Sequence, residues 1–205
     1  MLMENKILKE LKHHIPFAAL ASIVSLIIIS FWYFLSKGTF VSYNVESFEL
    51  FHYAHIFFSG MASAAMFYRY RKKITYALLV GIFSTLSICM LSDIIFPYLG
   101  GLIMGFDMHF HLTVLEEPLA VFGIVILGSL IGIWRKITKL PHFLHVFLST
   151  FASLFYLVVF GVEITVFSAV GIFAIVTFSV ILPCCLSDIV LPLIFAKGGR
   201  YESHT

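Results

Sequence analysis

The residues best suited to chemistry in this chain are histidines, and eight of the nine occur in close pairs. In two pairs the spacing is three residues, which places both imidazoles on one face of a helix. Two motifs of the form Cys-x-x-Ser-Asp add a thiol and a carboxylate. Together these motifs contain His52, His55, Cys89, Asp93, His142, His145, Cys184 and Asp188. Imidazole, thiolate and carboxylate are ligands for Zn²⁺, Ni²⁺, Co²⁺ or Fe²⁺, whereas Mg²⁺ and Ca²⁺ prefer oxygen ligands alone.

The same residues reveal an internal repeat. The segment 52–59, HYAHIFFS, recurs as HFLHVFLS at 142–149, a shift of 90 residues. The segment 89–97, with its cysteine, Ser-Asp pair and proline, recurs at 184–192, a shift of 95 residues. Apolar segments resemble one another by chance, but matched His, Cys, Asp and Pro do not. We therefore interpret the chain as a duplication and expect a kink or a break near Pro183, where the second copy has its extra residues.

A duplicated ligand set predicts two symmetry-related metal sites. The first set comprises His52, His55, Cys89 and Asp93, with His109, His111 and Glu116 as further candidates. The second set comprises His142, His145, Cys184 and Asp188, with His14 and its neighbour His13 as further candidates.

Simpler roles stay open for several of these residues. Histidines near helix ends can lie at a membrane interface, and cysteines and serines can pack in a core. Buried aspartates such as Asp93 and Asp188 can accept hydrogen bonds from serine and histidine and only hold helices together. A carboxylate such as Glu116 can stabilise the start of a helix.

The elements that must position these residues are membrane helices. Of the 205 residues, 60% are hydrophobic and 12% are charged, with a mean hydropathy of +1.02, whereas soluble domains carry about 25% charged residues. A span needs about 20 mostly apolar residues. Six stretches qualify: Pro16–Ser36, Leu50–Tyr70, Ile74–Pro97, Thr113–Trp134, His142–Gly161 and Ile164–Phe195. We predict a single all-helical membrane domain over 1–205, with one repeat at about 6–105 and the other at about 106–197.

Basic residues set the orientation, because they accumulate in cytoplasmic loops. With a cytoplasmic N-terminus, the outer segments hold only Lys37. The inner segments hold Lys6, Lys9, Lys12, Arg69, Arg71, Lys72, Lys73, Arg135, Lys136, Lys139, Lys197 and Arg200. We therefore predict a multi-pass protein of the cell membrane with both termini in the cytoplasm. Three helices per repeat make the second copy inverted. The basic residues follow from topology, so they give no reason to expect a nucleic-acid partner.

Inverted repeats are typical of secondary transporters. We therefore expect a transport or binding protein, not an enzyme, with the lipid bilayer around it and a divalent transition metal ion as substrate. Two alternatives remain open. Paired histidines on facing helices are also typical of an electron carrier with two b-type haems. A metal-bound water beside an aspartate would serve an intramembrane zinc hydrolase.

Overall fold

The computed structural model describes residues 16, 19–20, 22–31, 34–35, 45–136, 139–185 and 191–195. Every regular element in these ranges is a helix, which confirms the all-helical prediction for this part of the chain. The elements are α2 (Val45–Tyr70), α3 (Ile74–Met90), a π-helical turn (Leu91–Ile95), α4 (Phe96–Ile103), α5 (Thr113–Glu116), α6 (Pro118–Arg135), α7 (Lys139–Phe160), α8 (Val166–Cys185) and α9 (Leu191–Phe195).

Most helices lie where the sequence predicts apolar stretches, but their ends differ. Helix α2 begins at Val45, so His55 lies well inside it and not near its start. The predicted helix 164–195 is described as α8 and α9, and Pro183 lies inside α8, which continues to Cys185. The intervening residues 186–190, which include Asp188, lie outside the described ranges.

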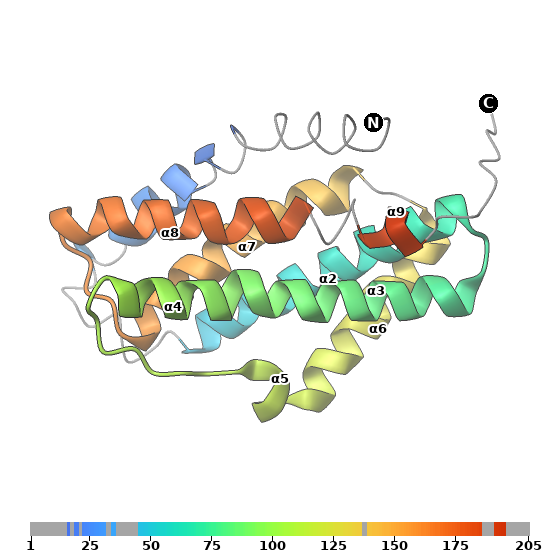
Figure 1. The fold of residues 1–205 in the computed structure, drawn as a ribbon, viewed down its shortest axis with the longest axis horizontal. Coiled ribbons are helices and arrows are strands. Elements are labelled where there is room, and N and C mark those ends of the chain that lie inside the picture. The colour runs from blue at the N-terminus through green and yellow to red at the C-terminus, as the bar shows by residue number, and fades with distance from the viewer. Residues whose placement is uncertain are drawn as a thin grey trace.

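Two pairs of helices run antiparallel through the bundle. Figure 1 shows α3 and α4 as one continuous rod with α8 alongside, while α6 crosses this rod at an angle. Contacts between Phe96 and Phe178 and between Gly100 and Ile175 fix the antiparallel order of the rod and α8. Along α2 and α7 the ring contacts are Phe48 with Phe160, Phe51 with Phe155, and His55 with His145. Helices α2 and α7 are therefore also antiparallel.

Helix α6 packs against α2 through glycines. A Cβ atom at Gly128 would collide with the carbonyl oxygen of Phe57. A Cβ atom at Gly132 would collide in the same way with the carbonyl oxygen of Met61. Small residues spaced by four are a common means of bringing two membrane helices into backbone contact.

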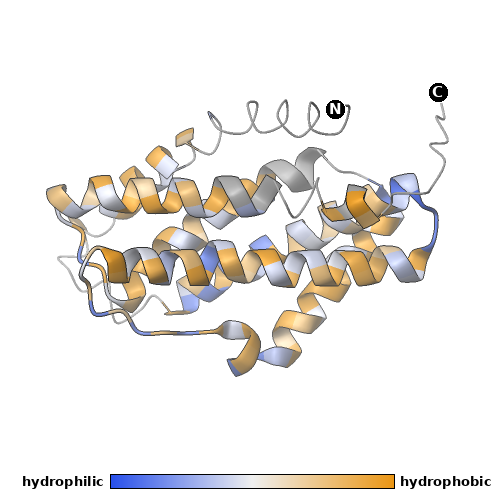
Figure 2. Ribbon diagram, in the orientation of Figure 1, coloured by the Kyte–Doolittle hydropathy of each residue, from blue (hydrophilic) through white to orange (hydrophobic). Residues whose placement is uncertain are grey.

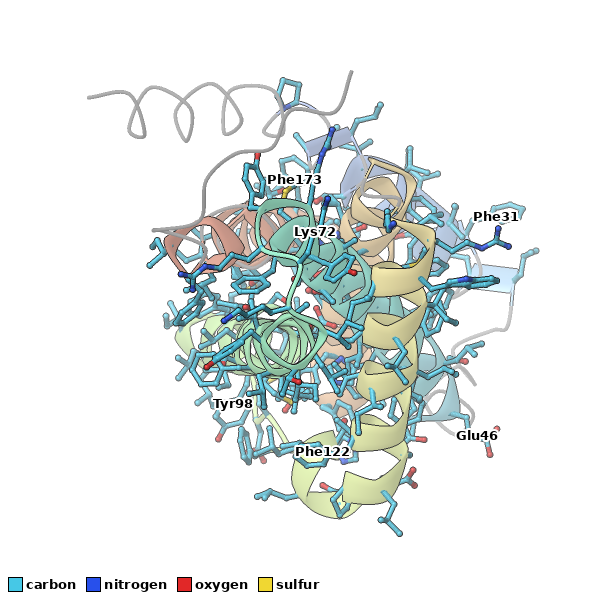
Figure 3. The ribbon with its side chains drawn as sticks, turned by 90° about the vertical axis from the view of Figure 1, so that its right-hand side faces the viewer. Phe31, Glu46, Lys72, Tyr98, Phe122 and Phe173 are labelled. Carbon is cyan, nitrogen blue, oxygen red and sulfur yellow. The ribbon has the colours of Figure 1, made fainter. Side chains whose placement is uncertain are left out.

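The surface of the bundle is apolar over long stretches. The combined helix Ile74–Ile103 and helix α6 are each long and apolar enough to cross a membrane. Three shorter apolar helical stretches, Ser22–Phe31, Leu144–Phe160 and Phe167–Val180, accompany them among the described residues. Figure 2 shows hydrophobic residues along the outside of the helices, with the hydrophilic turn between α2 and α3 at one end. In Figure 3, Phe31 and Phe122 point outward from the bundle.

Candidate metal centre

A π-helical turn positions the central carboxylate. Pro97 has no N–H, so it cannot donate the usual helical hydrogen bond to the carbonyl of Asp93, and its ring crowds that carbonyl. The helix responds by widening, and the N–H of Phe96 donates to the carbonyl of Leu91, five residues back. Asp93 lies in this turn with its side chain fully buried. Single π-helical turns inside α-helices are frequent at functional sites.

Two imidazoles from α2 converge on this carboxylate. The Nδ1 atoms of His52 and His55 lie 2.8 Å and 2.6 Å from the same oxygen, Asp93 Oδ2. A carboxylate oxygen accepts, so both Nδ1–H groups donate to it. Both rings are buried, with exposed fractions of 0% and 1%. Charged groups withdrawn this far from water must be paired, and here the three side chains satisfy one another.

Serines complete the carboxylate's hydrogen bonds. Ser92 and Ser149 each donate to Asp93 Oδ1 at 2.8 Å. Ser149 comes from α7, and one turn later Ser153 donates to the carbonyl oxygen of Ser92 at 2.9 Å. Asp93 thus accepts four hydrogen bonds from three helical segments, and α7 is fastened to the π-helical turn at two points.

This arrangement has the ligand types for one metal ion, gathered in one place. One ligand atom from each of His52, His55 and Asp93 lies within 4.8 Å of the others. A tetrahedral ion with ligands at about 2.1 Å separates those atoms by about 3.4 Å. The present nitrogen–oxygen separations are hydrogen-bond distances. An ion among these three atoms must therefore displace the two shared protons and move the groups apart by roughly 0.7 Å.

Two further predicted residues adjoin the cluster. Cys89 Sγ lies 3.6 Å from His55 Nε2, one helical turn before Asp93. His145, from the second predicted set, stacks on His55 with ring centroids 5.5 Å apart and planes inclined by 10°. The Nε2 atom of His52 is buried and has no hydrogen-bond partner among the described residues. Leaving a buried polar atom unpaired costs about 1–3 kcal/mol, so this nitrogen is available for a ligand.

Two other predicted residues form a separate group nearer the surface. His111 Nδ1 lies 2.9 Å from Glu116 Oε1, and His111 Nε2 lies 3.9 Å from Glu49 Oε1. Glu117 is close by and accepts a hydrogen bond from Tyr53 at 2.7 Å. Glu49 precedes the predicted membrane segment 50–70. Its burial, together with the negative charge of Glu117, raises its pKa above the usual value.

The loop 104–112 that carries His111 is held by the end of α7. His109 N donates to the carbonyl oxygen of Phe160 at 2.8 Å, and Tyr156 Oη accepts from His111 N at 3.1 Å. Gly161 has a φ of 152°, and a Cβ there would lie 2.5 Å from Asp107 O. Only glycine therefore suits this crossing. The side chain of His109 is exposed, and its loop position keeps it out of the buried cluster.

The other predicted ligands of the second set lie outside the side chains that the structure describes. His142 lies in α7 and Cys184 in α8, but their side chains are outside the described set. His14 and Asp188 lie wholly outside it. Sequence reasoning missed the part played by Ser149 and missed Glu49 altogether. The spacing of three residues between Glu49 and His52 was the available signal for the latter.

No protein-family model, curated protein sequence or solved structure matches the chain. Function therefore has to be argued from the chemistry of the site itself.

Proposed function

We propose that this chain is a multi-pass membrane protein that transports a divalent transition metal ion through the His52–His55–Asp93 cluster. The observation that carries the proposal is this cluster: two imidazoles and a carboxylate, fully buried in an apolar helix bundle. Intramembrane ionisable groups are expensive, and they commonly mark ion pathways.

A membrane location is supported by the distribution of polar and apolar side chains. The outward residues of α6 are apolar, and Leu119 is 90% exposed. Phe167 at the start of α8 is 94% exposed. The interior instead holds histidines, an aspartate and many serines. A water-soluble protein of this size rarely exposes large contiguous apolar patches, whereas lipid solvates such a surface. We therefore assign all six apolar segments to the membrane.

Two inverted repeats are supported by which helices touch. His55 and His145 occupy equivalent positions in the repeated motif, and they stack on each other. Equivalent residues can touch only where the axis relating the two copies passes between them. Antiparallel pairing of α2 with α7 fits an axis lying in the membrane plane. The cluster would then lie near the middle of the bundle, where inverted-repeat transporters bind their substrates.

The geometry favours a metal ion over haem. Axial ligation needs ring nitrogens that point at iron from opposite sides of a wide slot. His55 and His145 instead present parallel ring faces to each other. His52 and His55 direct their Nδ1 atoms at Asp93. The zinc hydrolase is also less well supported. Asp93 is the one buried carboxylate among the described residues, and as a metal ligand it would not also serve as the general base.

Transport by this cluster would exchange protons for metal. An ion that binds the two imidazoles and Asp93 displaces the shared protons, so metal binding should release protons and should strengthen as the pH rises. Rocking of one repeat against the other would then expose the loaded cluster to the opposite side.

The test uses the full chain, purified in detergent without added metal. Bound metal is determined by elemental analysis, and Zn²⁺, Ni²⁺, Co²⁺ and Fe²⁺ are titrated at equilibrium. We expect Asp93→Asn to weaken binding by about 10- to 100-fold or more. The matched control is Asp107→Asn, which neutralises an exposed carboxylate in the loop 104–112 and should bind as the wild type does. Asp188→Asn tests the second predicted site.

Uptake into vesicles follows for any ion that binds. Metal uptake by the wild type and by Asp107→Asn, with none by Asp93→Asn, supports transport. No binding of any of the four ions, or equal binding by Asp93→Asn and wild type, would overturn the proposal. The cluster would then be a hydrogen-bonded link between helices.

A further inference from the structure

We infer that His111 and Glu49, oriented by Glu116, form a second cation site, through which divalent transition metal ions reach the buried cluster. We call these three residues the vestibule site. The inference rests on the proposed function. It adds a second binding step before the buried cluster, a route for the ion between the two sites, and a gate on that route.

The vestibule site has the geometry of a partly assembled metal site. The separation of 3.9 Å between His111 Nε2 and Glu49 Oε1 is too long for a hydrogen bond. Two ligand atoms at about 2.1 Å from a shared ion lie between roughly 3.0 and 4.2 Å apart, depending on the angle at the metal. An ion therefore fits between these two atoms as they stand. His111 Nε2 is buried and has no hydrogen-bond partner among the described residues.

Glu116 supplies the second feature of such a site. Metal-binding histidines usually donate their other ring N–H to a carboxylate, which fixes the ring and raises its basicity. His111 does so through Nδ1, 2.9 Å from Glu116 Oε1. Glu116 is itself held by the N–H of Leu112, which lies 3.3 Å from the same oxygen. The ring of His111 is further fixed by stacking on Phe160, with centroids 4.8 Å apart.

Charge and exposure distinguish the vestibule site from the buried cluster. The side chains of Glu49 and Glu116 are 21% and 52% exposed, so an ion can arrive from water. Glu49 and Glu116 flank the imidazole, and Glu117 lies close enough to Glu49 to interact with it electrostatically, so the negative potential of this region attracts cations. Two protein ligands with water around them give weaker binding than the buried cluster. Weak binding at the first site allows the ion to leave it for the buried cluster.

A single aromatic ring separates the two sites. Phe48 is fully buried and stacks on His52, with ring centroids 5.3 Å apart. The edge of the same ring packs against His111, with centroids 5.8 Å apart. Phe48 also contacts Tyr156 and Phe160, which hold it in place. We assign Phe48 as the gate, because its movement would join the unpaired Nε2 of His111 to that of His52.

The experiment measures Zn²⁺ binding to the full chain in detergent as an isotherm with two classes of site. The wild type should show a tight and a weak class. His111→Ala should raise the dissociation constant of the weak class by about tenfold or more and leave the tight class intact. Asp93→Asn should do the reverse. His109→Ala is the matched control, because this exposed histidine lies two residues away in the same loop.

Further variants distinguish a loss of metal binding from a folding defect in His111→Ala. Glu49→Gln keeps the side-chain shape and should weaken the same class as His111→Ala. Phe48→Ala should speed the filling of the tight class several-fold in stopped-flow mixing, with little change in its affinity. Identical isotherms for wild type, His111→Ala and Glu49→Gln would overturn the vestibule site and leave the buried cluster standing. If the wild-type protein binds no Zn²⁺ at either class of site, the proposed function is overturned as well.

Discussion

At the scale of residues, the centre is a carboxylate whose four hydrogen bonds join three helical segments. His52 and His55 bind one oxygen, while Ser92 and Ser149 bind the other. The ionised carboxylate is thereby stable without water, and both imidazoles are locked in orientation. A metal ion held by the two Nδ1 atoms and Asp93 must replace the protons that these groups now share, so binding in this mode is linked to proton release.

The hydroxyl of Ser149 should therefore contribute more to the free energy of unfolding than an average serine hydroxyl does. Ser149→Ala removes one hydrogen bond to a buried charge, and we expect the free energy of unfolding to fall by about 1.5–3 kcal/mol. Ser84 offers the matched control, because its hydroxyl is also buried but has no hydrogen-bond partner among the described residues. Ser84→Ala should be neutral or slightly stabilising. Thermal unfolding in detergent compares the two, and equal losses would contradict the role given to Ser149.

Sequence spacing predicted part of this centre. The intervals between His52 and His55 and between Cys89 and Asp93 fix which side chains share a helix face, and the structure brings these side chains together. Spacing within one helix does not determine how two helices slide past each other. The sequence therefore could not predict that Ser149 bonds Asp93 or that His145 stacks on His55.

At the scale of elements, the π-helical turn decides where Asp93 points. The third span predicted from the sequence ends at Pro97. The helix instead continues to Ile103, because the widened turn absorbs the missing hydrogen bond. A continuous α-helix would rotate every residue on one side of the turn by about 100° relative to those on the other. The turn therefore keeps Asp93 facing α2 while Gly100 still faces α8.

Replacing Pro97 tests this account. Pro97→Ala restores an N–H that can donate to the carbonyl of Asp93, so the helix can regain its regular form. We expect metal affinity to fall by about 10- to 100-fold, as it does when an orienting contact is lost, while thermal stability changes little. Pro118→Ala is the control, because Pro118 lies in the first turn of α6, where proline is tolerated. Equal metal affinity in the wild type and Pro97→Ala would mean that the π-helical turn is not needed for metal binding.

Close packing of α2 and α6 gives a second test at this scale. Gly128→Ala places a methyl group against the carbonyl of Phe57 and should force the helices apart, at a cost of about 1–3 kcal/mol. Gly123 lies on the same helix with open space beside it. Gly123→Ala should be neutral or slightly stabilising, because alanine favours the helix. The apparent melting temperature in detergent distinguishes the two, and equal tolerance would contradict the backbone contact.

At the scale of the whole molecule, the ends of the bundle differ in charge. The turn between α2 and α3 contains Arg71, Lys72 and Lys73. The opposite end holds the loop 104–112 and the turn after α7, which are joined by the hydrogen bond from His109 to Phe160. The helical class was predictable because the chain contains apolar stretches of about 20 residues or more, the length that a helix needs to cross a membrane. The crossing angles in Figure 1 were not predictable, since they depend on which small residues meet across each interface.

The proposed orientation predicts which of these ends faces the cytoplasm. In whole cells, a membrane-impermeant maleimide should label Asp107→Cys and Glu163→Cys, because both positions are exposed at the end proposed to face outward. Lys72→Cys should be labelled only after the membrane is permeabilised. Wild-type protein gives the background from its native cysteines. Glu163 tests the inversion of the second repeat. The turn after α7, which contains Glu163, corresponds in the repeat to the basic turn between α2 and α3, which contains Lys72. The two positions lie at opposite ends of the bundle, because α2 and α7 are antiparallel. Labelling of Lys72→Cys and Glu163→Cys from the same side would therefore mean that the bundle does not span the membrane between these two ends, and rocking of one repeat against the other would lose its basis.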